Sequence, residues 1–234
     1  MVAGLVRGFT GFGTGMVVAP VVSSFYSIEA ALVIIFFIDG IPALPAVVPE
    51  FKKCQWRELL LCIFGSALAI PIGISIVTLT DQTPLRWVIA IVIFVTVAAL
   101  WSGYIYKGPR GKFISIFVGS FSGILGTTAA LPGPPVILYW MASKLPAFTV
   151  RANTMVFLFL IDIIIGLALI FAGMVTLQFF TMAVAVAPIY LLGLLIGGRL
   201  FGFASEQTYR NFAFIVILLT AILSLPILDA LFSR

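Results

Sequence analysis

Two aspartates stand inside long apolar runs of the sequence, where a charged side chain is costly. Asp39 ends residues 35–39, IFFID, and Asp162 ends the similar residues 158–162, LFLID. We place each near the middle of a membrane helix, where an aspartate costs about 2.5–3.5 kcal/mol and must face the protein interior and a partner. Such a carboxylate could load and release a proton, or it could cap free N–H groups at the end of a neighbouring helix. The sequence leaves both roles open.

Two further segments combine glycine, threonine and proline within apolar surroundings. The first covers residues 8–15, followed by Pro20, and the second covers residues 123–128, followed by the proline-rich residues 131–135. Breaks of this kind survive at membrane depth only where the backbone is buried in protein or lines a cavity. Half-helix ends there point N–H groups and a positive dipole inward, which suits an anion, although glycines also serve tight helix packing alone. The candidate anion-binding residues of the two breaks are Thr10, Gly11, Gly13, Thr14, Gly15, Gly126, Thr127, Thr128, Gly133 and Pro134.

Two arginines lie next to these features. Arg7 immediately precedes the first break, and Arg151, with Asn153 two residues later, opens the apolar run that carries Asp162. A guanidinium in either place could bind an oxyanion or balance an aspartate. Either arginine could equally be a loop charge that sets membrane topology. We therefore add Arg7, Arg151 and Asn153 to the candidate substrate-binding residues.

The composition identifies the class of protein that holds these residues. Of 234 residues, 62% are hydrophobic and 9% are charged, whereas a soluble domain has about 45–50% apolar and about 25% charged residues. This excludes a soluble enzyme, a disordered tail and a nucleic-acid binder. The chain has no histidine, and its two cysteines have neither metal-site nor redox spacing. We expect no metal, no cofactor, no enzymatic activity and no cleavable signal peptide.

The apolar runs predict an all-α polytopic membrane protein with an internal duplication. Residues 35–39 align with residues 158–162 at an offset of 123, and Gly73 aligns with Gly197 at an offset of 124. The two breaks align at Gly11 and Gly123. Each half, 1–106 and 107–234, then holds one broken, re-entrant-like segment and three transmembrane helices. The six continuous helices are expected near residues 28–49, 58–79, 85–106, 148–173, 177–201 and 210–231.

The distribution of cations favours halves of opposite orientation. If all eight segments cross the membrane, the thirteen cations split eight to five between the two sides. If each broken segment enters and leaves by the same face, the split is ten to three, which the positive-inside rule favours and which makes the repeats inverted. The ten expected on the cytoplasmic side are Lys52, Lys53, Arg57, Lys107, Arg110, Lys112, Lys144, Arg151, Arg199 and Arg210.

Several of these motifs resemble a known family. Residues 7–13, RGFTGFG, with Pro20, the pair Ile38 and Asp39, and residues 133–139, GPPVILY, resemble the TauE/SafE family of sulfite exporter and sulfonate-permease-like transporters. The resemblance covers nearly the whole chain and implies a bacterial or archaeal inner-membrane transporter of sulfite, sulfonates or related organosulfur anions. The chain departs from the family in two places. Six residues precede the first arginine, where members usually have a longer apolar stretch, and the second break is less rich in glycine.

These observations together predict a secondary transporter that moves small sulfur-containing anions, such as sulfite or sulfoacetate, across the inner membrane by alternating access and with proton coupling. A passive anion channel would use the same binding site and need no protonatable group. A membrane-embedded enzyme or an assembly factor is the third alternative. The expected partners are a small anionic substrate, membrane lipid and protons. A homodimer is left open.

Overall fold

The computed structural model describes residues 1–101, 111–141, 145–203 and the single residues 208, 212 and 215. All regular structure in this part of the chain is helical, which confirms the predicted all-α class. Five helical segments are long and apolar enough to cross a membrane, so the chain is a multi-pass membrane protein. They are Ile28–Lys53, Trp56–Leu79, Lys112–Ala129, Ala147–Phe171 and Leu177–Phe201. The helix predicted at 210–231 lies outside the described residues, except for the single residues 212 and 215.

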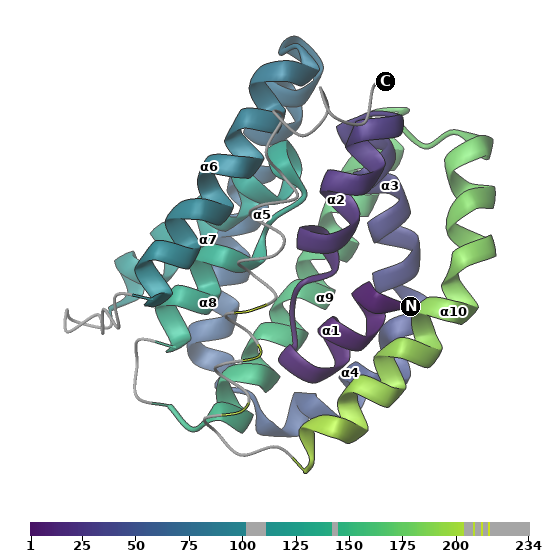
Figure 1. Cartoon of the computed structure of the whole chain (residues 1–234). Helices are drawn as coiled ribbons and strands as arrows, with labels where there is room; N and C mark the ends of the chain where they lie inside the picture. Colours follow the sequence, from purple (N-terminus) through teal and green to yellow (C-terminus); the bar gives the residue numbers. More distant parts are fainter. Residues whose placement is uncertain (102–110, 142–144, 204–207, 209–211, 213–214, 216–234) are drawn as a thin grey trace.

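The first broken segment consists of two short helices, α1 (Val2–Thr10) and α2 (Thr14–Phe25). Gly11 and Gly13 separate them with φ values of 84° and 107°, a left-handed conformation that glycine adopts without steric cost. In Figure 1 the chain descends through α1, turns at the break and rises again through α2. The chain is therefore interrupted between α1 and α2, within the glycine-rich residues 8–15.

The second break lies later than residues 123–128, where we predicted it. The helix α7 (Lys112–Ala129) continues through these residues, and α8 (Gly133–Met141) follows after a short turn. The hydroxyls of Thr127 and Thr128 bond to carbonyls one turn earlier in α7, so these residues are compatible with a helix. The turn itself begins at Ala130, with φ 56°, and continues into Pro132, which has no N–H to extend the helix.

The helix predicted at 28–49 also ends early. Its regular part, α3 (Ile28–Asp39), stops at Asp39, so this aspartate ends a helix and does not lie in the middle of one. Gly40 and prolines 42, 45 and 49 prevent a continuous helix beyond it. The chain continues through three short elements, η1 (Ile41–Ala43), α4 (Leu44–Val47) and η2 (Val48–Lys53).

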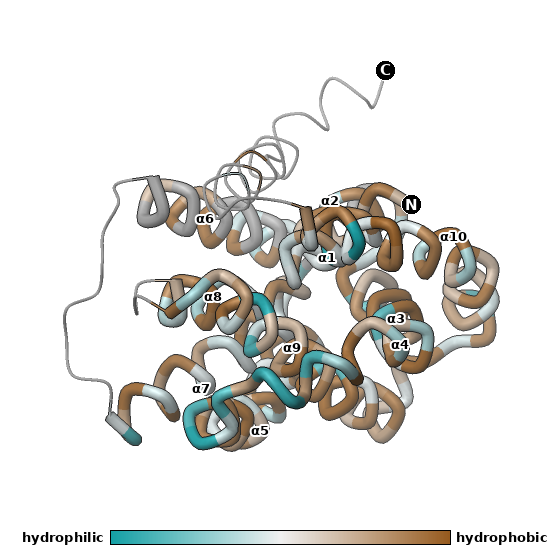
Figure 2. Tube along the Cα trace, turned by 90° about the horizontal axis from the view of Figure 1, so that it is seen from below, coloured by the Kyte–Doolittle hydropathy of each residue, from teal (hydrophilic) through white to brown (hydrophobic). Residues whose placement is uncertain are grey.

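Long helices complete the described part of the bundle: α5 (Trp56–Leu79), α6 (Gln82–Trp101), α9 (Ala147–Phe171) and α10 (Leu177–Phe201). Seen from below, α9 lies at the centre, with α1, α2, α3 and α10 on one side and α5, α6, α7 and α8 on the other (Figure 2). The outer faces of α5 and α10 expose large apolar side chains such as Leu68 and Leu192, each 60% exposed. Such a surface suits lipid and not water.

The broken segment of each half packs closely against a long helix of the other half. The helix α1 lies along α10, and α7 lies along α5. A Cβ on Gly4 of α1 would collide with the carbonyl oxygen of Tyr190, and a Cβ on Gly123 of α7 would lie 2.5 Å from the carbonyl oxygen of Ser66. Small residues let membrane helices approach this closely. The packing alternative for the glycines therefore applies to those inside α1 and α7, whereas Gly13 and Gly15 of the first break line a cavity.

Candidate functional site

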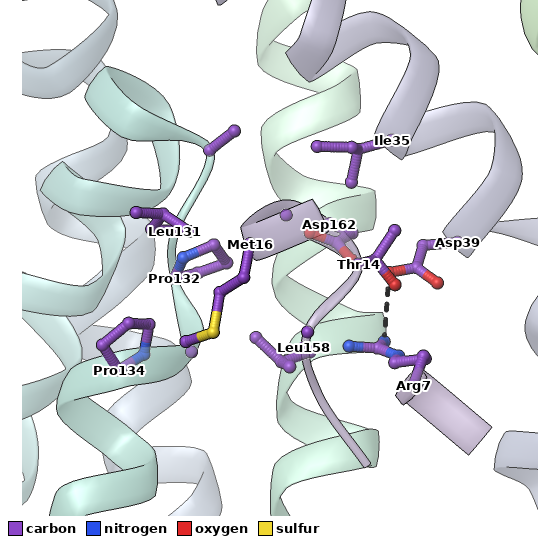
Figure 3. A pocket seen from close by; sticks show the side chains of 14 residues that line it. Arg7, Thr14, Met16, Ile35, Asp39, Leu131, Pro132, Pro134, Leu158 and Asp162 are labelled. Carbon is purple, nitrogen blue, oxygen red and sulfur yellow. Dashed lines mark ion pairs between the residues drawn. The ribbon is translucent and has the colours of Figure 1, made fainter. Parts of the chain in front are cut away.

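The two breaks meet at one small cavity in the middle of the bundle (Figure 3). The first break contributes the start of α2, and the second contributes the residues around the start of α8. Ionisable side chains reach the same cavity from α1, α3 and α9 (Figure 3). The lining residues are Arg7, Gly13, Thr14, Gly15, Met16, Ile35, Asp39, Ala130, Leu131, Pro132, Gly133, Pro134, Leu158 and Asp162.

Contact between the breaks depends on Gly15. A Cβ at this position would collide with the carbonyl oxygen of Ala130 in the second break. Because a backbone carbonyl cannot rotate away as a flexible side chain can, the start of α2 and the second break lie this close only with glycine here. The glycine therefore brings residues more than a hundred positions apart in the sequence to one wall of the cavity.

The two half-helices do not offer equal numbers of N–H groups to the cavity. The first turn of a helix leaves its N–H groups without intrahelical partners, and in α2 the helical bonding begins with Val17 N–H donating to Gly13 O at 3.1 Å. The first-turn donors of α2 include Thr14 and Gly15. In α8, Pro134 and Pro135 have no N–H. The start of α2 is consequently the stronger anion-binding end.

Arg7 lies at the centre of a polar network beside this end. Its side chain is buried, with Nη2 3.5 Å from Asp39 Oδ2. The Tyr190 hydroxyl donates a hydrogen bond to Asp39 Oδ1 and lies 2.8 Å from the Thr14 hydroxyl. Within the described structure, Nε and Nη2 of Arg7 have no hydrogen-bond partner. The Nε donor of this buried guanidinium is therefore left for a ligand, and Nη2 is held only by its ion pair with Asp39.

Asp162 borders the same cavity but has different surroundings. It lies in the middle of α9, is 6% exposed, and forms no hydrogen bond or ion pair with any residue that the structure describes. It also borders a second cavity, lined mainly by apolar side chains that include Leu32, Phe36 and Ile165. The two aspartates that occupy equivalent sequence positions thus differ: Asp39 is paired, and Asp162 is not.

Arg151 points away from the cavity and clamps the end of α1. Its Nη1 lies 2.6 Å from Glu50 Oε1, and its Nη2 and Nε donate to the carbonyls of Gly8 at 2.6 Å and Phe9 at 3.3 Å. The guanidinium also stacks over the Phe201 ring, 4.6 Å from its centre. These carbonyls form the negative end of the α1 dipole, which a cation stabilises. The geometry gives Arg151 a positioning role beneath the first break.

The other predicted residues lie around the cavity without lining it. Asn153 Oδ1 accepts a hydrogen bond from the Gln55 N–H at 2.9 Å and so joins α9 to the start of α5. The Thr10 hydroxyl donates a hydrogen bond to the carbonyl of Phe12 and so stabilises the chain at the first break. Gly11 packs against Arg151. Gly126 borders the second, apolar cavity, and Thr127 and Thr128 bond to carbonyls of their own helix.

Sequence reasoning missed Tyr190 and Glu50. Tyr190 lies inside the apolar run 177–201, where a buried hydroxyl requires a hydrogen-bond partner. That requirement could have identified Tyr190 from the sequence. Glu50 stands beside Lys52 and Lys53 in what resembles an ordinary polar loop. Because its partner Arg151 is about a hundred residues away, no local pattern indicates that Glu50 is buried.

Among the residues described, no group of three or more His, Cys, Asp or Glu could hold a metal ion. Cys54 lies between two spans, where burial, with a smaller contribution from the Glu50 carboxylate, raises the pKa of its thiol to about 12. The thiol is therefore protonated at neutral pH and is a poor nucleophile.

Removing the Glu50 carboxylate should destabilise the fold. Glu50→Ala leaves the Arg151 guanidinium buried without its counterion, at a cost of about 3–5 kcal/mol, and we expect the midpoint of thermal unfolding in detergent to fall by about 6–20 °C. Lys53, 48% exposed and 3.1 Å from Glu50, provides the control, because losing a surface ion pair costs about 0–1 kcal/mol. Equal midpoints for Glu50→Ala and Lys53→Ala would contradict the clamp.

Comparison with known proteins adds the family. The model of the family described as "Sulfite exporter TauE/SafE" matches residues 1–224 of the chain. No curated protein and no solved structure gives a significant match. The family model spans both breaks and the helices that carry Arg7, Asp39 and Asp162. The chain belongs to the TauE/SafE sulfite exporter family.

Proposed function

We propose that the chain is a secondary transporter that carries small sulfur oxyanions, such as sulfite and sulfonates, across the inner membrane through the cavity between the two breaks. The observation that carries the proposal is Arg7, a buried arginine beside the N-terminal end of α2 whose Nε and Nη2 have no hydrogen-bond partner among the described residues. A guanidinium presents a planar fork of donors that matches oxyanion geometry. The family supports a sulfur anion as the substrate.

The proposed binding mode combines three kinds of donor. The sulfonate or sulfite oxygens would accept hydrogen bonds from Arg7, from the first-turn N–H groups of α2 and from the Thr14 hydroxyl. Gly13 and Gly15 present bare backbone to the cavity and allow an anion to approach closely. Hydrogen bonds between charged partners contribute about 1.5–3 kcal/mol each, so this set suffices for binding in the micromolar to millimolar range.

We also propose that residues 1–106 and 107–234 are inverted repeats that rock against each other in alternating access. Figure 1 shows α3 and α9 running in opposite directions, and likewise α5 and α10. The contacts of α1 with α10 and of α7 with α5 also relate the two halves by constant sequence offsets. Gly4 faces the carbonyl of Tyr190, and Gly123 faces the carbonyl of Ser66. In the broken segments, Gly123 comes 119 positions after Gly4. In the partner helices, Tyr190 comes 124 positions after Ser66.

A second pair of contacts has the same sequence offsets, 119 positions between the broken segments and 124 between their partner helices. Gly197 of α10 faces the carbonyl of Leu5, and Gly73 of α5 lies beside the carbonyl of Ile124. A common pair of offsets in independent contacts is expected for a two-fold relation between halves and not for chance packing. Substrate sites of inverted-repeat transporters lie between discontinuous helices near the membrane centre, and this cavity likewise lies between the two breaks.

The inverted arrangement predicts which loops are reachable from outside the cell. The start of α5 and the end of α10 lie at one end of the bundle (Figure 1), with Lys52, Lys53 and Arg199 there, and the positive-inside rule makes this end cytoplasmic. An epitope tag inserted at Gly173 should bind antibody in intact cells, and a tag at residue 144 only after permeabilisation. Tags that both label in intact cells would contradict the inversion.

Proton coupling is part of the proposal because two carboxylates share the cavity with the anion site. A passive channel needs no such groups, since a pore selects anions with fixed donors alone. The test uses purified protein in proteoliposomes with sulfite, sulfoacetate, taurine, sulfate and chloride, each with and without a pH gradient. We expect a sulfur oxyanion to accumulate against its gradient when the pH gradient is present. Fluxes of several anions at rates indifferent to pH would establish a channel.

A further inference from the structure

The cavity holds one cationic and two acidic side chains, and these three groups constrain what can bind. Arg7 reaches it from α1, Asp39 from the end of α3 and Asp162 from the middle of α9 (Figure 3). If all three were ionised, the empty cavity would carry a net negative charge in poorly solvated surroundings. An isolated buried charge is so costly that it is neutralised or paired. The pairing in the structure shows how the three charges can balance.

Asp39 is the partner of Arg7 in the structure. Its Oδ2 lies 3.5 Å from Arg7 Nη2, and its Oδ1 accepts the Tyr190 hydroxyl. Both carboxylate oxygens are thus engaged by groups that favour the ionised form. Asp162 has neither kind of partner among the described residues and also borders the second cavity, which is mainly apolar. The neutral form is therefore assigned to Asp162, and the empty cavity carries no net charge.

An incoming anion competes with Asp39 for the same guanidinium. The anion would bind Arg7 at the cavity face, where the Asp39 carboxylate now sits. One arginine cannot neutralise two anions in a buried site, so a second negative charge must be removed as the anion binds. Asp39 is placed to lose its charge, since protonation at a carboxylate oxygen turns it into a neutral acid that still hydrogen-bonds Tyr190.

We propose that a monovalent anion displaces Asp39 from Arg7 and that Asp39 takes up one proton as this happens. The step is balanced: the anion replaces the carboxylate as the counterion of Arg7, and one proton converts that carboxylate to a carboxylic acid. The loaded cavity is again neutral, so one anion moves with one proton and no net charge. This inference rests on the proposed function and adds its stoichiometry, its proton carrier and a preference for monovalent anions.

The neighbours of Asp39 leave no other described group for this role. The ionisable groups that face it are Arg7 from α1, Asp162 from α9 and Tyr190 from α10, and α2 contributes only the Thr14 hydroxyl. Arginine does not lose its proton in proteins. Asp162 is already neutral in the assignment above. The two aspartates at equivalent positions therefore have different roles: Asp39 exchanges a proton, and Asp162 remains protonated throughout.

The test counts protons while methanesulfonate, which stays monovalent, binds to the purified protein. Titration calorimetry in buffers of different ionisation enthalpy gives the protons taken up per anion across about pH 5–9. We expect a maximum of one proton for the wild type, for Asp162→Asn and for the matched control Asp81→Asn, which alters an exposed carboxylate outside the cavity. Asp39→Asn should bind methanesulfonate with no proton uptake.

A measurement on the wild type alone keeps the proposal testable if Asp39→Asn does not fold. Because a proton enters with the anion, affinity should fall as pH rises, by up to tenfold per pH unit, and level off at low pH. In proteoliposomes, wild-type flux should ignore the membrane potential. Methanesulfonate binding without proton uptake, or proton uptake that persists in Asp39→Asn, would overturn this inference. Failure of the wild type to bind methanesulfonate and isethionate would instead contradict the proposed function.

Discussion

Arg7→Lys should lower the affinity for methanesulfonate about 10- to 100-fold while leaving the protein folded. Lysine keeps the positive charge beside Asp39 but replaces the planar fork by a compact ammonium, so one or more hydrogen bonds to the oxyanion are lost. Each such bond contributes about 1.5–3 kcal/mol, and about 1.4 kcal/mol corresponds to tenfold in affinity. Arg199, exposed at the end of α10, provides the matched control. Arg199→Lys should bind as the wild type does.

A pair of further variants separates binding from folding. Arg7→Gln leaves Asp39 buried without its counterion and should destabilise the protein by about 3–5 kcal/mol. Arg7→Gln combined with Asp39→Asn removes both charges and should recover most of that stability, because neither partner is left uncompensated. The double variant should still fail to bind methanesulfonate. Wild-type affinity in the double variant would show that Arg7 serves the fold and not the anion.

Gly15→Ala should separate the two breaks and reduce methanesulfonate affinity at least about tenfold. The added methyl group would collide with the carbonyl oxygen of Ala130, and overpacking at such a contact costs about 1–3 kcal/mol. Relief requires a shift of α2 relative to the second break. Such a shift moves the N–H groups of α2 away from Arg7, so the donors no longer converge on one anion.

Gly111→Ala is the control for this substitution. Gly111 precedes α7 with an ordinary φ of −127°, and a Cβ there would meet no atom of the described residues within 4 Å. Binding and thermal stability should therefore equal those of the wild type. The two measurements are affinity by calorimetry and the midpoint of thermal unfolding in detergent. Unchanged affinity in Gly15→Ala would mean that contact between the breaks does not position the anion donors.

The general architecture could be predicted because membranes allow few solutions. Apolar runs must form helices in lipid, so composition and run length indicated the all-α membrane class. Asp39 and Asp162 stood out because charges inside such runs are expensive, and Arg7 stood out because it directly precedes the first break. The structure places all three at one cavity together with residues of both breaks. Their assembly follows from a general rule: costly groups in a membrane protein face inward and find each other.

What sequence reasoning missed depends on contacts between distant residues. The second break was placed too early because Gly123 resembles a break, whereas in the structure it is a packing surface against α5. Arg151 resembled a ligand for the anion until Glu50 was found beside it. Tyr190 reaches Asp39 across 151 residues of sequence. No local periodicity encodes such pairings, since each depends on how two remote helices come together.

The most direct measurement of the central claim is a crystal structure with bromomethanesulfonate, whose bromine can be located by anomalous scattering. We expect a single strong peak in the cavity between the two breaks, with the sulfonate oxygens within hydrogen-bond distance of Arg7 and of the first-turn N–H groups of α2. Asp39 should have moved away from the guanidinium. A peak beside Arg151 and Glu50 instead, or an empty cavity at concentrations that saturate transport, would contradict the assignment of this cavity as the anion site.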